Sequence, residues 1–164
     1  MIRPEIEKQI DALVARLPRP QAAMLPALHL IQDDLGHVPV PAREWLAGKL
    51  GVSPAAVEAV LSFYTLYRRE PGGKYVLHVC STLPCALRGC EQVFEYLEKI
   101  LGVEAGGTTA DGRFTLKRAE CLGACDQAPV LQANGEFHER IAELNPETGA
   151  VSFERLEAIL ENLK

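Results

Sequence analysis

The spacing of apolar residues changes near residue 72 of this chain. Before that point, apolar positions recur at intervals of three and four residues, which is the period of amphipathic helices. After Gly72 and Gly73, short apolar runs alternate with helical stripes, as is typical of mixed α/β structure. The sequence therefore predicts an α+β protein with a helical unit over residues 1–71 and a mixed domain over residues 72–164.

Four helices are predicted in the helical unit. The apolar stripe from Ile6 to Leu17 forms the first, and Pro18 ends it because proline cannot continue a helix. Ser53 is expected to cap the fourth helix, with Pro54 at its first position. The predicted helices span residues 6–17, about 21–35, a short stretch between 41 and 51, and 54–64.

Strands and helices alternate in the mixed domain. Asn134-Gly135 is the strongest hairpin signal, because both residue types accept the backbone angles of a two-residue turn. The predicted strands cover residues 75–79, 114–117, 130–133 and 136–138, and the predicted helices cover 86–101 and 153–163. The order β-α-β-β-β-α, with both cysteine loops at strand ends, fits a thioredoxin-like fold.

Four of the five cysteines form two close pairs. Four residues separate Cys80 from Cys85, and three separate Cys121 from Cys125. Four thiolates favour zinc or an iron-sulfur cluster over hard cations. Structural zinc sites often use two-residue spacings, whereas plant-type ferredoxins contain a pair with four intervening residues. We therefore interpret these four cysteines as ligands of one [2Fe-2S] cluster.

The sequence also predicts the packing or conformation of three residues near the cysteine pairs. Cys90 is surplus to a four-ligand centre and is expected to pack as a small apolar side chain on one helical stripe, together with Leu87, Phe94, Leu97 and Leu101. Gly123, inside the second pair, is expected to let the main chain approach the cluster closely. Pro129 is expected to follow an ordinary trans peptide bond, because cis bonds are only about 5% of such bonds in folded proteins.

Charge and composition narrow the possible partners. The net charge is −5, which argues against a nucleic-acid partner, and a helix-turn-helix interpretation of residues 51–64 lacks basic residues. No apolar run approaches the roughly 18 residues that indicate a membrane span, so direct membrane insertion is not expected. The N-terminal residues lack the features of export or transit signals, and the odd number of cysteines fits a reducing compartment. We expect a soluble cytoplasmic protein.

The sequence around the cysteines resembles one protein family. Val79–Gly89 and Glu120–Val130 carry the two pairs and are the most specific part of the likeness, while Leu61–Tyr64 and Pro71–Tyr75 extend it upstream. They resemble the small [2Fe-2S] subunit of the NADH-oxidizing module of respiratory complex I, the NuoE type. Cys90 is a departure, because the family pattern does not require it.

The resemblance implies a specific function. It implies a thioredoxin-like ferredoxin domain whose [2Fe-2S] cluster is bound by Cys80, Cys85, Cys121 and Cys125. It also implies a larger partner subunit that carries FMN, NADH and its own iron-sulfur cluster, with the helical unit helping to dock it. The chain would then be an electron-transfer subunit of a prokaryotic NADH:quinone oxidoreductase, in the peripheral arm at the cytoplasmic face of the inner membrane. Its cluster would exchange single electrons with the FMN.

The residues alone leave alternatives open. No glycine-rich dinucleotide fingerprint and no P-loop occurs, so the NADH and FMN sites are expected on the partner subunit. The same module could belong to the diaphorase part of an NAD-linked hydrogenase or formate dehydrogenase. A structural zinc-binding interaction module would use the same ligands. A thioredoxin-like dithiol enzyme is a weaker alternative, because neither cysteine pair has the C-x-x-C spacing of that chemistry.

Overall fold

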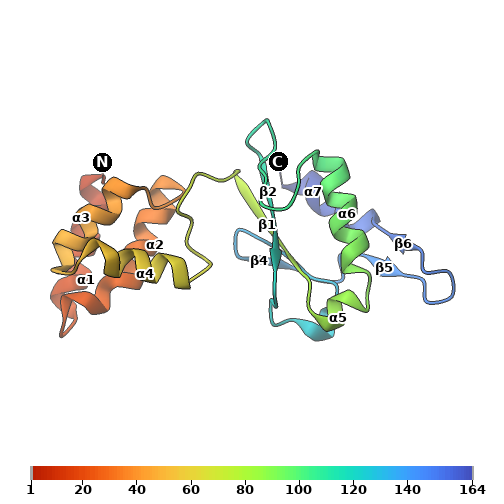
Figure 1. The fold of residues 1–164 in the computed structure, drawn as a ribbon, viewed down its shortest axis with the longest axis horizontal. Helices are drawn as coiled ribbons and strands as arrows, with labels where there is room; N and C mark the ends of the chain where they lie inside the picture. The colour runs from red at the N-terminus through yellow and green to blue at the C-terminus, as the bar shows by residue number, and fades with distance from the viewer. Residues whose placement is uncertain (1, 164) are drawn as a thin grey trace. The chain divides into compact units, whose positions relative to one another are not determined.

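The computed structural model describes residues 2–163. The chain divides into two compact units, Met1–Pro71 and Gly72–Lys164. The first unit contains helices, and the second contains a mixed sheet covered by helices (Figure 1). The expected α+β class is therefore confirmed. Each unit has its own apolar core.

The helices of the first unit lie close to their predicted positions. They are α1 (Pro4–Arg16), a 3₁₀ turn η1 (Pro20–Ala23), α2 (Met24–Leu35), α3 (Val40–Leu50) and α4 (Pro54–Phe63). The predicted second helix begins later than expected, because an earlier start would place Pro26 in a helix interior, where it removes a hydrogen bond. Ser53 caps α4 as predicted, since its hydroxyl accepts a hydrogen bond from the Ala56 amide at 3.2 Å.

The core of this unit is formed mainly by α1, α2 and α3. These helices bury several large apolar side chains almost completely, including Ile10, Leu28, Ile31, Leu46 and Leu50. Within residues 2–163, no single helix combines the length and apolarity needed to cross a membrane, and only α3 and α4 together, bent by 117°, meet those criteria.

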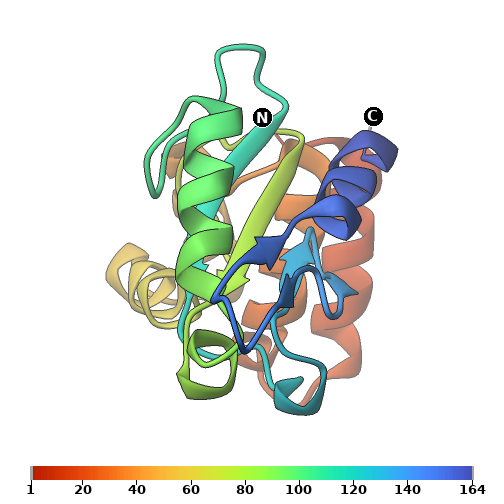
Figure 2. The ribbon, with the colours of Figure 1, turned by 90° about the vertical axis from the view of Figure 1, so that its right-hand side faces the viewer.

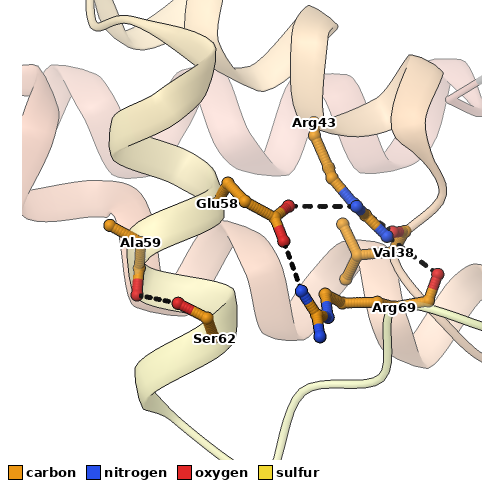
Figure 3. A network of polar contacts seen from close by, with 6 residues as sticks. All are labelled: Val38, Arg43, Glu58, Ala59, Ser62 and Arg69. Carbon is orange, nitrogen blue, oxygen red and sulfur yellow. Dashed lines mark hydrogen bonds and ion pairs between the residues drawn. The ribbon is translucent and has the colours of Figure 1, made fainter.

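Hydrogen bonds of two arginines hold the segment after α4 against the helices (Figure 3). Arg43 donates hydrogen bonds to the carbonyl oxygens of Val38 at 2.7 Å and Arg69 at 2.8 Å, and to the Glu58 carboxylate at 3.0 Å. Arg69 binds the other oxygen of Glu58 at 2.7 Å. Hydrogen bonds from Arg69 and the charge of Arg43 outweigh burial and hold the pKa of Glu58 below its ordinary value.

The second unit is built on a four-stranded sheet. Its strands are β1 (Tyr75–Cys80), β2 (Phe114–Ala119), β3 (Leu131–Ala133) and β4 (Glu136–His138), in the spatial order β2-β1-β3-β4. β1 pairs with β2 in parallel, and β3 is antiparallel to both β1 and β4. Asn134 and Gly135 have positive φ angles at the turn between β3 and β4. The predicted strands and hairpin are confirmed.

Two helices cover one face of this sheet. α6 (Cys90–Leu101) and α7 (Glu154–Asn162) lie on the same side of the strands (Figure 2). The core between them contains Phe94 and Leu97 from α6, Leu156 from α7, and Leu77 and Leu116 from the sheet, all almost fully buried. This packing leaves the cysteine loops at one end of the sheet.

The structure of this unit differs from the sequence analysis at three points. The helix expected over 86–101 is broken into a single turn, α5 (Leu83–Ala86), and α6, because Gly89 takes a left-handed conformation with φ 86° between them. The small hairpin of β5 (Glu143–Leu144) and β6 (Val151–Ser152) was not predicted, because two-residue strands are too short to show alternation. The Ala128-Pro129 bond is cis. A trans bond was expected because cis bonds before proline are rare on average.

Candidate metal centre

The parallel strands β1 and β2 bring the two cysteine loops to the same end of the sheet. Cys80 is the last residue of β1 and is in register with Ala119, the last residue of β2, and Cys121 follows two residues later. Ser81 binds the Ala119 carbonyl oxygen through its amide at 2.9 Å and its hydroxyl at 3.0 Å. Figures 1 and 2 show α5 and the loop after β2 at this same end.

The first pair lies in the interior. Only 3% of Cys80 and 1% of Cys85 is exposed. The Cys80 sulfur lies 3.5 Å from the Thr82 hydroxyl and 3.8 Å from the Glu120 carbonyl oxygen, which belongs to the second cysteine loop. The Cys80 amide donates to the Val130 carbonyl at 3.1 Å. The first pair is therefore held between the end of the sheet and the loop that carries the second pair.

The pKa values of the two buried thiols are shifted in opposite directions. Burial opposes ionisation of Cys80, but hydrogen bonds from the side chain and main chain of Thr82 and from the main chain of Leu122 lower its pKa below the ordinary value. Burial, with the neighbouring Cys80 and Cys90 thiols, raises the pKa of Cys85 to about 12. Donors that stabilise a thiolate also stabilise a sulfur ligand that carries negative charge. The hydrogen bonds at Cys80 therefore favour a thiolate at this sulfur.

The second pair lies at the surface. Cys121 and Cys125 are both exposed. A hydrogen bond between their side chains raises the pKa of Cys125, and the Cys80 thiol adds to this electrostatically. Gly123 has φ 78°, a conformation that favours glycine, and its amide donates to the Cys121 sulfur at 3.4 Å. The main chain thus approaches a cysteine sulfur at this position.

The donor set fits a two-iron cluster. Among residues 2–163, no three His, Cys, Asp or Glu side chains lie close enough to hold a single metal ion. The four thiols are arranged as two pairs, and the Cys80 sulfur of the first pair lies 3.8 Å from the Glu120 carbonyl oxygen in the loop that carries the second. Two pairs would supply four thiolates, which is the ligand number of a [2Fe-2S] cluster.

Cys90 lies beside the first pair. It is 1% exposed and belongs to one buried cluster with Cys80, Cys85 and Val130. It also lines the buried face of α6 with Phe94 and Leu97, as predicted. Leu87 was expected on this face but is 68% exposed, because the break at Gly89 turns it away. The position of Cys90 beside the first pair was missed, although its spacing from Cys85 repeats that of Cys85 from Cys80.

Apolar and charged side chains surround the loops at the surface. Leu83 and Leu87 are about 70% exposed on either side of the buried Cys85. Next to the second pair lies a polar recess of about 460 Å³, whose lining includes four charged residues, Arg88, Asp126, Arg140 and Glu143.

Comparisons with known proteins agree with this geometry. Residues 10–163 match the family of thioredoxin-like [2Fe-2S] ferredoxins. The chain is 39% identical over 159 residues to an NADH-quinone oxidoreductase subunit of Rhizobium meliloti (strain 1021), covering 97% of this chain and 89% of that relative. It is 40% identical over 144 residues to the NADH-quinone oxidoreductase subunit 2 of Thermus thermophilus, covering 88% and 75%.

A solved structure also has a similar fold. It is the crystal structure of an NAD+-reducing [NiFe]-hydrogenase in the H2-reduced state, with a TM-score of 0.70 and 24% identity. The likeness covers 85% of this chain but only 22% of the hydrogenase chain. At this identity the likeness bears on the fold alone.

Proposed function

The chain belongs to the thioredoxin-like [2Fe-2S] ferredoxin family, and on this premise we propose that it is an electron-transfer subunit of an NADH:quinone oxidoreductase. It binds one [2Fe-2S] cluster and exchanges single electrons with the FMN of a partner subunit that oxidises NADH. The observation that carries the proposal is the meeting of two cysteine pairs at one end of a parallel strand pair. Relatives named as subunits of NADH-quinone oxidoreductase, at 39% and 40% identity, support this assignment.

Cys80, Cys85, Cys121 and Cys125 are the proposed ligands. When bound, the cluster supplies a site that accepts and releases one electron at a time. The Thr82, Leu122 and Gly123 donors described above lie against cysteine sulfurs, where they offset the negative charge that reduction adds. The buried first pair excludes water on one side, and the exposed second pair leaves a short path to a partner on the other.

The NADH and FMN sites are proposed to lie on the partner subunit, and the helical unit is proposed to dock it. Three large apolar side chains at the end of α4 support docking: Phe63 is 77% exposed, Leu66 47% and Tyr64 37%. Gln32 holds their backbone, since its amide donates to the Leu66 carbonyl at 3.0 Å and its oxygen accepts from the Arg68 amide at 2.6 Å. Exposed aromatic side chains on a fixed backbone are typical of contact residues in interfaces.

The proposed assembly is the peripheral arm of the complex, at the cytoplasmic face of a prokaryotic inner membrane. The same chain in an NAD-linked hydrogenase or formate dehydrogenase would dock a similar flavin subunit. Affinity purification of the tagged chain from its own cells distinguishes these assemblies by the other subunits that are recovered. Recovery of hydrogenase or formate dehydrogenase subunits, without quinone-reducing ones, would replace the assembly proposed here.

Metal analysis tests the cluster itself. We expect the full chain, prepared without oxygen, to contain about two irons and two acid-labile sulfides, and to give a paramagnetic signal after one-electron reduction. Zinc without sulfide would show a structural zinc module instead. Titration of the metal-free chain with zinc serves as the control, because four thiolates also bind zinc.

A further inference from the structure

Three thiols, rather than two, are buried at the first half of the site. Cys80, Cys85 and Cys90 form one cluster with Val130, and each of the three is at most 3% exposed. All three are free thiols. The sequence spaces them evenly, with four residues between each and the next. The proposed cluster uses only two of these sulfurs, so one soft, buried metal ligand is left over beside the iron site.

Gly89 sets the position of the third thiol. It joins α5 to α6 with φ 86°, which places Cys90 at the first position of α6, directly after the single turn that carries Cys85. A side chain at residue 89 would approach the Val151 side chain to 3.1 Å. Glycine therefore permits the sharp break between α5 and α6, and Cys90 follows that break directly.

We propose that Cys90 is a reserve ligand that replaces Cys85 when the Cys85 sulfur cannot bind iron. This inference rests on the proposed cluster. Cys85 is the replaceable member because it lies on one short turn, linked to Cys90 by residues 86–89 only. Cys80 is fixed at the end of β1 and between Thr82 and Glu120, so neither neighbouring thiol can take its place without moving the strand.

Using Cys90 in place of Cys85 as a ligand does not change the number of protons released when the cluster assembles. A cysteine thiol loses one proton to solvent when its sulfur bonds to iron, whether the residue is Cys85 or Cys90. The number of thiolate ligands, and the irons, sulfides and electrons that the cluster requires, are the same in both cases. The substitution therefore requires no oxidant or reductant.

Four forms of the full-length chain test the proposal. They are the wild type, Cys85→Ala, Cys90→Ala and the double variant, each analysed for iron, sulfide and the spectrum of the reduced cluster. We expect Cys90→Ala to match the wild type. Cys85→Ala should keep about two irons and two sulfides with a shifted spectrum, and the double variant should lose them. Cys125→Ala is a matched control. The second pair has no third thiol nearby, so this variant should contain no iron or sulfide.

The decisive comparison is between the single and double variants. Equal iron loss in Cys85→Ala and in the double variant, with the wild type fully loaded, would overturn the reserve role and leave the cluster proposal intact. A wild type without iron and sulfide would instead overturn the proposed function. If Cys85→Ala does not fold, Cys85→Ser with and without Cys90→Ala gives the same comparison, because any ligation by serine is common to both.

Discussion

The sulfur of Cys80 lies 3.8 Å from the carbonyl oxygen of Glu120, so the first cysteine pair touches the loop that carries the second. This contact arises because β1 and β2 are parallel and end in register. The carboxyl ends of parallel strands meet at one edge of a sheet, where loops from distant parts of the sequence come together. The topology of two strands thereby places two distant cysteine pairs in one site.

The isolated chain should be brown and redox-active but unable to oxidise NADH. Its sequence contains the four proposed cluster ligands and no recognised dinucleotide motif. NADH-driven dye reduction by the purified chain measures this directly. Addition of a separately purified flavin subunit should restore the activity, whereas activity in the chain alone, without bound flavin, would contradict the proposed division of labour.

Phe63 should contribute to docking rather than to folding. It is 77% exposed, so Phe63→Ala should change the free energy of unfolding by no more than about 0.5 kcal/mol. If Phe63 is buried against the flavin subunit, its loss should weaken binding by about tenfold or more. Val40, also exposed at 55%, provides the matched control Val40→Ala. Equal effects of the two variants in a binding titration would argue against a specific Phe63 contact.

Much of this architecture could be predicted from the sequence, because long helices and buried strands have clear periods. The residues near the site were harder to predict, since their conformation depends on contacts between distant segments. Gly89 breaks a helix whose apolar pattern continues through the break, so Leu87 is exposed although its spacing suggested burial. Sequence spacing paired Cys80 with Cys85, but only the packing of α5 against α6 places Cys90 beside them.

Glu58 should stabilise the helical unit in a pH-dependent way. Arg69 and Arg43 lower its pKa from the ordinary 4.5, so its contribution is present above that value and disappears as the pH falls through the lowered pKa. Glu58 is 40% exposed, so Glu58→Gln should cost only about 0.5 to 1 kcal/mol at neutral pH. Fluorescence of Trp45, the only tryptophan, reports unfolding of this unit. A difference that persists unchanged at low pH would exclude the ion pairs as its cause.

The Thr82 hydroxyl should raise the reduction potential of the cluster. It lies 3.5 Å from the Cys80 sulfur, and a donor at this position stabilises the reduced state, which carries more negative charge. Thr82→Val removes the donor but keeps the branched shape of the side chain. Loss of one hydrogen bond to a charged acceptor costs about 1 to 2 kcal/mol, so the potential should fall by roughly 40 to 90 mV at most. Thr82→Ser keeps the hydroxyl and should retain the wild-type potential in a redox titration. A fall of the same size in both variants would show that altered packing at residue 82, rather than loss of the hydrogen bond, lowers the potential.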